Sequence, residues 1–269
     1  MEIKSYTIEL INMIREKSPL IHNITNFVVM NSSANILLAI GASPVMAHCR
    51  SEVEEMTSIA GALVLNIGTV QEDWTESMIC AAKTANSKGI PVILDPVGAG
   101  ATKLRSETVE RILKETKISV LRGNASEIFS LASSEVKTRG VDSSLLITSD
   151  HIDIAKEIAN DFKCIIAISG EEDLITDGNQ VLRVANGHPL MTRVTGTGCG
   201  LTAVTAAFCA VAGEKLLEAT TSAFAFYGLC AEKAVITSDN PGSFSVAFLD
   251  ALYSIENEDI STFIKVRKG

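Results

Sequence analysis

The amino-acid sequence predicts an α/β fold, a three-layer α/β/α sandwich with a mostly parallel central sheet. Short uninterrupted apolar runs, such as 62–67 and 90–96, alternate with longer stretches whose apolar residues recur at helical spacing. Strands that are buried on both faces by crossover helices have continuous apolar runs of this kind. No change of composition marks a linker and no internal repeat is visible in the 269 residues, so we expect a single domain spanning residues 1–269.

Four strands are expected in the middle of the chain. The first is ALVLNI (62–67), and the helical stretch after it ends at Gly89, which suits a left-handed helix terminus. The second strand is IPVILDP (90–96), the third is ISVLRGN (118–124) and the fourth is KCIIAISG (163–170). Helices are expected between these strands, which places the strands parallel to one another.

The remaining elements are expected from turn and cap signals. Ser106 can cap the helix SETVERILKETK, and a further helix is expected near DHIDIAKEIANDF. DLITDGNQVLRV predicts a hairpin, because Asp177 and Gly178 separate two alternating runs. Residues 1–60 are predicted to be mostly helical, with Gly41 ending one helix, and the C-terminal third is predicted to form a helical layer.

Composition narrows the classes of function. The net charge of −9 argues against a nucleic-acid surface, which needs clustered Lys and Arg. No apolar run reaches membrane-spanning length without polar breaks, and the first residues lack the pattern of a signal peptide. We therefore expect a cytoplasmic protein with no nucleic-acid or membrane partner. The six cysteines are dispersed without paired spacing, which makes a disulfide framework or a structural zinc site improbable.

Polar residues that follow the predicted strands are candidates for a site, since open parallel sheets bind ligands beyond the carboxyl ends of their strands. Asp95 could hold magnesium through water or could cap a turn. Gly68 could allow close approach to a ligand or could belong to an ordinary tight turn. Ser169, followed by Gly170, could contact a nucleotide phosphate.

The segment after the third strand has two readings. Asn124 can cap the next helix and Glu127 occupies the matching capping-box position. Arg122 and Glu127 at one strand end also suit a phosphate and its metal. Sequence spacing does not separate the two.

VTGTGCGLTAV (194–204) places glycines at alternate positions where an apolar helix begins. The amides of Gly196, Thr197 and Gly198 could form an anion hole, because the first amides of a helix have no internal partner. A tight structural turn is the alternative. The same helix start could lower the pKa of the Cys199 thiol, which makes Cys199 a candidate base or nucleophile.

Together with HNITNFVVMNSSAN and the loop at Pro44–Met46, these segments resemble the hydroxyethylthiazole kinase family of the ribokinase-like superfamily. The resemblance runs from about residue 19 to the C-terminal helices. It implies ATP-dependent phosphorylation of 4-methyl-5-(2-hydroxyethyl)thiazole, a salvage step toward thiamine. It also implies a homotrimer with active sites at subunit boundaries.

The resemblance implies roles for individual residues. Cys199 stands where most of the superfamily has an aspartate that accepts the proton of the substrate hydroxyl. Arg122 and Ser169 meet ATP, and Asp95 and Glu127 organise Mg²⁺. The thiazole is held by Asn26, Val28, Pro44, Met46, Gly68 and Gly196.

Two alternatives stay open. A ribokinase-like kinase of another small molecule, such as hydroxymethylpyrimidine or a sugar, would share the fold but usually has Asp at the position of Cys199. A binding protein for thiazole or nucleotide would not need Asp95, Glu127 and Cys199 together.

Overall fold

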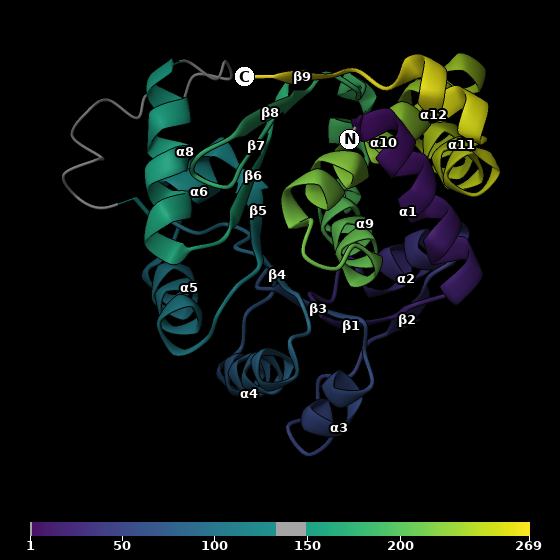
Figure 1. Cartoon of the computed structure of the whole chain (residues 1–269). Coiled ribbons are helices and arrows are strands. Elements are labelled where there is room, and N and C mark those ends of the chain that lie inside the picture. The colour runs from purple at the N-terminus through teal and green to yellow at the C-terminus, as the bar shows by residue number, and fades with distance from the viewer. Residues whose placement is uncertain (1, 133–148) are drawn as a thin grey trace.

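The computed structural model describes residues 2–132 and 149–269. Within these residues the centre of the molecule is a nine-stranded sheet in the order β2-β1-β3-β4-β5-β6-β7-β8-β9 (Figure 1). All pairs from β2 to β6 are parallel, and β7, β8 and β9 continue the sheet in antiparallel pairs. The strands are β1 (Leu20–Ile24), β2 (Ser43–Val45), β3 (Ala62–Asn66), β4 (Val92–Asp95), β5 (Val120–Asn124), β6 (Ile165–Ser169), β7 (Asp173–Thr176), β8 (Val181–Val184) and β9 (Val266–Lys268).

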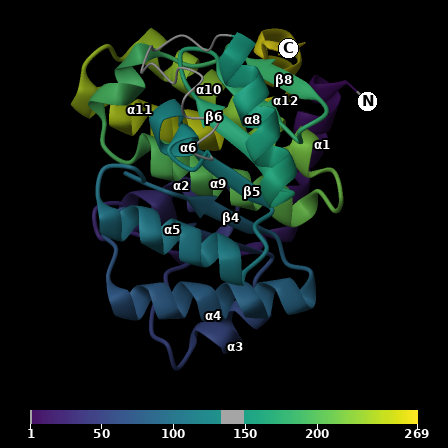
Figure 2. The same ribbon diagram turned by 90° about the vertical axis from the view of Figure 1, so that its left-hand side faces the viewer.

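Helices cover both faces of this sheet, as Figures 1 and 2 show. One layer contains α4 (Glu72–Lys88), α5 (Lys103–Glu115), α6 (Ala125–Phe129) and α8 (Ser149–Phe162), with α3 (Val53–Ser58) packed beside α4. The other layer contains α1 (Ile3–Lys17), α2 (Met30–Ile40), α9 (Thr197–Val211), α10 (Leu216–Thr237), α11 (Pro241–Ser254) and α12 (Asn257–Phe263), and a short 3-10 helix, η1 (Pro189–Arg193), precedes α9. The predicted α/β/α sandwich is confirmed.

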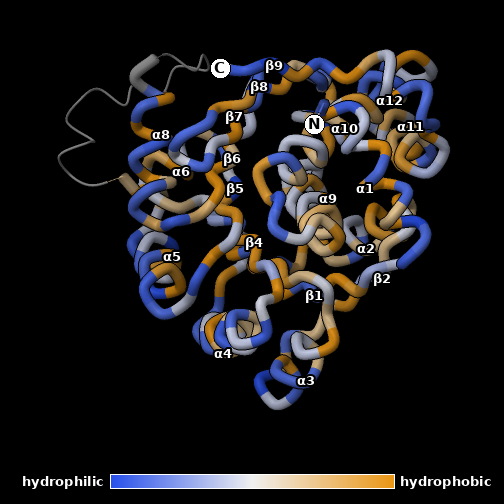
Figure 3. Tube along the Cα trace, viewed as in Figure 1, coloured by the Kyte–Doolittle hydropathy of each residue, from blue (hydrophilic) through white to orange (hydrophobic). Residues whose placement is uncertain are grey.

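Alternation along the strands divides the core into two parts. In β3, Leu63 and Leu65 face one hydrophobic cluster, whereas Ala62 and Val64 face the other. Successive side chains of a strand point to opposite faces, so a strand covered on both sides must be apolar throughout. Outer helices need only one apolar face, and α8 accordingly alternates hydrophobic and hydrophilic positions along its length (Figure 3).

The helix α9 is apolar on all sides because it is enclosed. Every residue from Gly200 to Cys209 is buried, since α9 packs on β3 and β4 and is covered by α1, α2 and α10. A helix in this position can direct only its N-terminal turn toward the ends of the strands. The fold therefore positions the segment that begins at Thr197 against the carboxyl ends of β3 and β4.

The strands expected in the middle of the chain are confirmed, each within a few residues. Gly41 (φ +94°) and Gly89 (φ +68°) end α2 and α4 in the left-handed conformation that their sequence context predicts. The hairpin of β7 and β8 is also confirmed, and its turn uses Gly178 at φ +92°.

One of the cap predictions is wrong. Ser106 does not cap α5; Thr102 does, because its extended backbone lets the side-chain oxygen accept from the Arg105 amide, while Ser106 accepts from the Gly100 amide instead. The first sixty residues are mostly helical, as predicted, but they also contain β1 and β2, which the sequence did not predict and which lie at one edge of the sheet. Among the described residues, no helix combines the length and hydrophobicity that crossing a membrane requires.

Candidate active site

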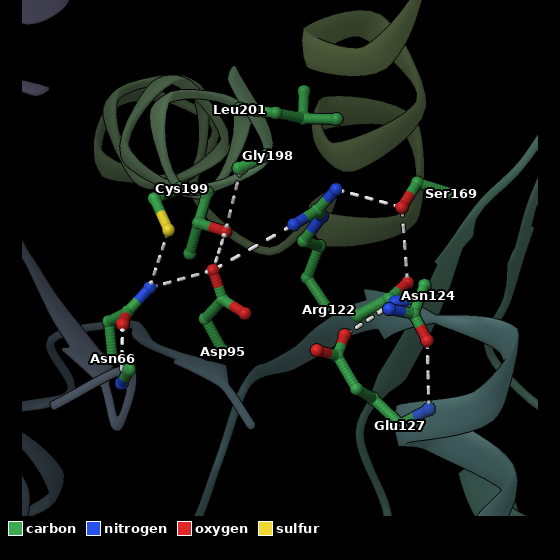
Figure 4. A network of polar contacts seen from close by, with 12 residues as sticks. Asn66, Asp95, Arg122, Asn124, Glu127, Ser169, Gly198, Cys199 and Leu201 are labelled. Atoms are coloured by element: carbon green, nitrogen blue, oxygen red, sulfur yellow. Dashed lines mark hydrogen bonds and ion pairs between the residues drawn. The ribbon is translucent and has the colours of Figure 1, made fainter. Parts of the chain in front are cut away.

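The ends of four parallel strands bring their polar residues together. Asn66 and Asp95 are register partners at the ends of β3 and β4, and Asn124 and Ser169 are partners at the ends of β5 and β6. The first turn of α9 faces them and contributes Cys199 (Figure 4). These residues are far apart in the sequence, and parallel strand order alone makes them neighbours.

Asp95 is the most enclosed carboxylate of this group, with 1% of its surface exposed. Its Oδ2 accepts hydrogen bonds from Asn66 Nδ2 at 2.9 Å and from Thr202 Oγ1 at 2.7 Å, and Arg122 Nη1 lies 3.8 Å away. Burial raises the pKa of Asp95 to about 6, although the positive charge of Arg122 opposes that shift. Its Oδ1 is buried and has no hydrogen-bond partner among the described residues, so this atom is available to a ligand.

Cys199 lies beside Asp95, and its thiol is protonated and therefore uncharged. Its Sγ accepts from Asn66 Nδ2 at 3.2 Å and, more weakly, from Asn26 Nδ2 at 3.6 Å. Burial, reinforced by the negative charge of Asp95, raises the pKa of the Cys199 thiol to about 11. The expected lowering of this pKa by the helix terminus is therefore wrong: desolvation outweighs it, and the thiol is protonated at pH 7.

The first amides of α9 are free of the helix ladder. The first backbone hydrogen bond of this turn joins Gly200 N–H to Gly196 O at 2.8 Å, so the amides of Thr197, Gly198 and Cys199 precede it. Their N–H groups lie at the positive end of the helix dipole, which favours an anion. The arrangement has the chemistry of an anion hole.

The three glycines of this motif have three different physical reasons. Gly196 has a φ of +86°, which a side chain would strain. A Cβ at Gly198 would lie 3.1 Å from Arg122 Nη1, so its absence makes room for the guanidinium. A Cβ at Gly200 would lie 2.5 Å from Ile36 Cδ1 and 2.6 Å from Tyr227 Oη, which is a packing constraint. Gly196 and Gly198 thus shape the site, and Gly200 lets α9 pack.

Arg122 connects the carboxylate with the residue at the end of β6. Its Nη2 donates to Ser169 Oγ at 2.8 Å, and Ser169 Oγ donates to Gly123 O at 3.3 Å (Figure 4). The side chain is 6% exposed, and its Nε has no partner among the described residues. A buried guanidinium with an unused N–H beside a helix terminus suits a phosphate group.

Glu127 forms the capping box that its spacing allows. Its Oε2 accepts from Asn124 N–H at 2.8 Å, and its own N–H donates to Asn124 Oδ1 at 2.9 Å. Its Oε1 accepts from Gly98 N–H at 2.9 Å, in the loop that follows Asp95. The charge of Glu127 is close enough to raise the pKa of Asp95. Capping therefore holds this carboxylate near Asp95 and does not compete with a role for it there.

Asn26 and Gly68 join this network, and Val28 joins it through its backbone. Asn26 Nδ2 donates to Asn66 Oδ1 at 2.8 Å, and Asn26 Oδ1 accepts from Val28 N–H at 3.1 Å. Gly68 N–H donates to Asn66 Oδ1 at 2.9 Å, and a Cβ at Gly68 would lie only 2.6 Å from Asn26 Nδ2. The Val28 side chain is 63% exposed.

Pro44 and Met46 are not hydrogen-bonded to this network in the described part of the chain. Pro44 lies in β2 beside Ile21 of β1, and Met46 follows that strand. His22 holds the next residue in place: its Nε2 bonds to Ala47 O at 2.8 Å, and its Nδ1 bonds to Thr57 Oγ1 at 2.9 Å. A carbonyl only accepts, so Nε2 carries a hydrogen, and burial lowers the pKa of His22 below its ordinary value, which favours the neutral ring.

Three contributors were not singled out as site residues from sequence. Asn66 bonds to both Asp95 and Cys199, Thr202 bonds to Asp95, and Trp74 packs against rings of neighbouring loops. Only weak features of the sequence point to these residues. Asn66 is the polar residue of an apolar strand, and Thr202 follows Cys199 by three positions, which places both on one face of the helix.

The residues present suit a cation that keeps several water ligands better than a cation whose ligands all come from the protein. No three His, Cys, Asp or Glu side chains gather as a metal site within residues 2–132 and 149–269. Magnesium is commonly held by one or two carboxylates, water and substrate phosphates. The unpartnered Oδ1 of Asp95, with Glu127 nearby, matches that kind of site.

Comparisons with known proteins agree on one family. The family model described as the hydroxyethylthiazole kinase family matches residues 11–258. A hydroxyethylthiazole kinase of Desulfotalea psychrophila is 54% identical over 261 residues, which is 97% of this chain and 95% of the relative. A hydroxyethylthiazole kinase of Thermoanaerobacter pseudethanolicus is 52% identical, covering 96% of this chain and 98% of its own.

Solved structures agree with the sequence relatives. The hydroxyethylthiazole kinase protein of Pyrococcus horikoshii OT3 has a TM-score of 0.89 at 45% identity, covering 98% of this chain and 99% of its own. The pyridoxal kinase of Staphylococcus aureus, solved with AMP-PCP and pyridoxal, has a TM-score of 0.61 at 17% identity over 93% of this chain and 98% of its own. That second likeness extends to the fold alone.

Proposed function

The chain belongs to the hydroxyethylthiazole kinase family, and from that premise we propose how its residues transfer a phosphoryl group from ATP to hydroxyethylthiazole. The reaction converts the hydroxyl of 4-methyl-5-(2-hydroxyethyl)thiazole to its phosphate and releases ADP. The observation that carries the assignment of the site is the convergence of Asp95, Arg122 and Cys199 at the N-terminus of α9. In metabolism we propose a salvage step toward thiamine.

The amides of the first turn of α9 and the Arg122 guanidinium would stabilise the negative charge of the phosphoryl group during its transfer. The N–H groups of Thr197, Gly198 and Cys199 are held in place before any substrate binds, so they need no reorganisation during the transfer. Arg122 is buried and anchored by Ser169, so its guanidinium would be held in place for the nucleotide phosphates. We assign the amides of Thr197, Gly198 and Cys199 to the anion hole, with Gly196 as the left-handed residue that presents them, and we assign Arg122 and Ser169 to ATP.

Asp95 and Glu127 would hold Mg²⁺, because Asp95 offers an unpartnered buried oxygen and the charge of Glu127 is close enough to raise the pKa of Asp95. The ion, when bound with ATP, supplies charge neutralisation for the phosphates. The described residues prepare the carboxylate for this role: Thr202 and Asn66 occupy Oδ2, which leaves Oδ1 free.

Cys199 is proposed to orient the substrate hydroxyl. A thiol with a pKa of about 11 is protonated at neutral pH, so it is a poor general base in its resting state. Phosphoryl transfer passes through a loose transition state, in which early removal of the hydroxyl proton matters less than alignment of the attacking oxygen. The thiol can provide that alignment by a hydrogen bond at Sγ.

The thiazole side of the site is proposed to consist of Asn26, Val28, Pro44, Met46, Gly68 and Gly196. Phe27 and Val28 are exposed to 56% and 63%, which supports a homotrimer whose neighbouring subunit covers this edge. A mass measurement in solution tests the trimer. We also propose that residues 1–269 act as one kinase domain, and the cytoplasmic location stays a prediction.

A substrate panel tests the function. The purified protein is incubated with magnesium-ATP and hydroxyethylthiazole, hydroxymethylpyrimidine or ribose, and ADP release is measured. ADP formation with hydroxyethylthiazole is the expected result. ADP formation with the pyrimidine alone would identify a different small-molecule kinase, and no ADP with any of the three would identify a binding protein.

A further inference from the structure

Asn66 uses every hydrogen-bonding position of its side chain. Its Oδ1 accepts from Asn26 Nδ2 at 2.8 Å and from Gly68 N–H at 2.9 Å. Its Nδ2 donates to Asp95 Oδ2 at 2.9 Å and to Cys199 Sγ at 3.2 Å (Figure 4). An amide has two acceptor sites and two hydrogens, so this buried side chain is fully satisfied.

The chemistry of the neighbours determines which way the amide faces. The backbone N–H of Gly68 can only donate, so the Asn66 atom beside it must be the oxygen. Nδ2 must then face Asp95 and Cys199. The same reasoning applies to Asn26, whose Oδ1 faces the Val28 N–H and whose Nδ2 therefore faces Asn66 and Cys199.

The direction of the thiol follows from these two amides. Both Asn66 and Asn26 present N–H groups to Sγ, so the sulfur acts as the acceptor in both contacts. The thiol hydrogen must point away from both amides. Two donated hydrogen bonds thus hold Sγ of Cys199, and its S–H is directed elsewhere.

We propose that Asn66 is a positioning residue for the phosphoryl transfer, which links Cys199 to Asp95 through the two hydrogens of one amide and fixes the direction of the thiol. The proposal rests on the role of Cys199 stated under Proposed function. Asn66 acts through Cys199, and it does so before the substrate arrives.

The loss of Asn66 would affect its two partners unequally. Asp95 would keep Thr202 at 2.7 Å and Arg122 at 3.8 Å. Cys199 would keep only the 3.6 Å contact from Asn26, and Asn26 would itself lose its acceptor on Asn66. The thiol would therefore lose its orientation, whereas the carboxylate would largely stay in place. Turnover should fall without a matching loss of substrate affinity.

A double-mutant cycle tests this proposal. The kcat and KM for hydroxyethylthiazole are measured for the wild type, Asn66→Ala, Cys199→Ala and the double variant, with magnesium-ATP in excess. Misplacement of a reacting group costs up to about 100-fold in rate, so we expect Asn66→Ala to lower kcat by about 10- to 100-fold and to change KM by less than about threefold. In the Cys199→Ala background, Asn66→Ala should lower kcat by less than about threefold.

Asn186→Ala is the matched control. Asn186 is a buried amide, 5% exposed, that donates to Phe263 O at 3.0 Å and accepts from Lys265 N–H at 2.7 Å, outside the proposed site. This variant should keep the kcat of the wild type as long as it is folded at the assay temperature. If Asn66→Ala is unfolded at the assay temperature, Asn66→Ser replaces it, because a hydroxyl can still accept from Gly68 N–H.

The outcomes separate the two claims. Equal losses of kcat from Asn66→Ala in both backgrounds, or an effect on KM alone, would overturn the proposal for Asn66. A wild-type kcat for Cys199→Ala by itself would instead overturn the role of Cys199.

Discussion

Thr202 Oγ1 donates a hydrogen bond of 2.7 Å to Asp95 Oδ2, joining the second turn of α9 to the end of β4. Both side chains are buried, so this contact replaces water that the carboxylate has lost. The bond lowers the pKa of Asp95 against the larger effect of burial. It also keeps Oδ2 occupied, and it is one reason why Oδ1 is the oxygen left for a ligand.

Replacing Thr202 by Val tests this relationship. A hydrogen bond to a charged group is worth about 1.5–3 kcal/mol, so we expect Thr202→Val to lower the free energy of unfolding by about that amount at pH 8. Thr205→Val is the control, because Thr205 is equally buried on α9 but bonds only to Leu201 O. Urea unfolding measures both variants. Equal destabilisation of the two would contradict a special role for the Thr202 bond.

Asp173 predicts a pH dependence of stability. Burial raises the pKa of this carboxyl to about 7, although a hydrogen bond from Gly170 N–H opposes the shift. An unfolded chain releases the proton near pH 3.9, so between about pH 4 and 7 the folded state binds more protons than the unfolded state. The contribution of Asp173 to stability is therefore present at low pH and decreases as the pH rises to about 7.

Asp173→Asn removes that dependence while keeping an oxygen for the Gly170 amide. The free energy of unfolding of the variant, minus that of the wild type, should increase as the pH is raised from about 4.5 to 7.5. Urea unfolding at several pH values in this range provides the measurement. A difference that stays constant with pH would show that the group titrates alike in the folded and unfolded states.

The same substitution is expected to affect different properties at Gly198 and at Gly200. Gly198→Ala would place a methyl group 3.1 Å from Arg122 Nη1, so we expect a higher KM for ATP with little loss of stability. Gly200→Ala would crowd Ile36 and Tyr227, and overpacking of this kind costs about 1–3 kcal/mol. Steady-state kinetics and urea unfolding of both variants distinguish them. A stability loss at Gly198 larger than that at Gly200 would invert the assignment.

The fluorescence of Trp74 is expected to report substrate binding. It is the sole tryptophan, and its ring packs in tilted contacts against His48, with 4.3 Å between ring centroids, and against Phe27, with 4.6 Å between ring centroids. Phe27 precedes Val28, and His48 bonds to Met46 O at 3.2 Å, so these ring contacts connect two loops proposed to hold the thiazole. Hydroxyethylthiazole alone should change the tryptophan fluorescence.

Trp74→Leu should raise the KM for hydroxyethylthiazole and leave kcat closer to that of the wild type, because Trp74 supports the loops and not the reacting groups. Tyr253→Leu, an exposed aromatic on α11, serves as the control. Unchanged fluorescence at thiazole concentrations shown by equilibrium dialysis to saturate the protein would exclude the proposed location of the substrate.

The parts of the fold that sequence predicted are those with strong local signals. The strands 62–67 and 163–170 are apolar runs whose burial needs no special partner. β1 was missed because His22 and Asn23 interrupt its apolar pattern, although both are buried in the structure. Their burial depends on tertiary partners such as Ala47 O and Thr57 Oγ1, which local periodicity does not reveal. β2 and β9 are three-residue strands, too short for a periodic signal.

Some features of the candidate site could likewise be predicted from the sequence, and others could not. Strand order predicted that Asp95, Arg122 and Ser169 would approach one another, because residues after parallel strands share an edge. The protonation of Cys199 could not be predicted, since it depends on how deeply α9 is covered and on the charge of Asp95. The contact of Asn66 with Cys199 spans 133 positions of the sequence and emerges only from the packing of α9 on the strand ends.

Cys199→Asp examines whether a carboxylate can take the place of the thiol. Aspartate has an ordinary pKa of about 3.9 and can accept the hydroxyl proton directly, so we expect this variant to remain active. The pH dependence of kcat is the appropriate measurement. An inactive but folded Cys199→Asp would indicate that the thiol has a role that a carboxylate cannot perform.

The most direct test of the account is a paired measurement on Cys199→Ala, in which thiazole affinity is determined by calorimetry and kcat by ADP release. We predict that the dissociation constant for hydroxyethylthiazole stays within about threefold of the wild type, whereas kcat falls about tenfold or more. An unchanged kcat would remove Cys199 from the reaction, and a loss of all thiazole binding would make the thiol structural; either result would contradict the account.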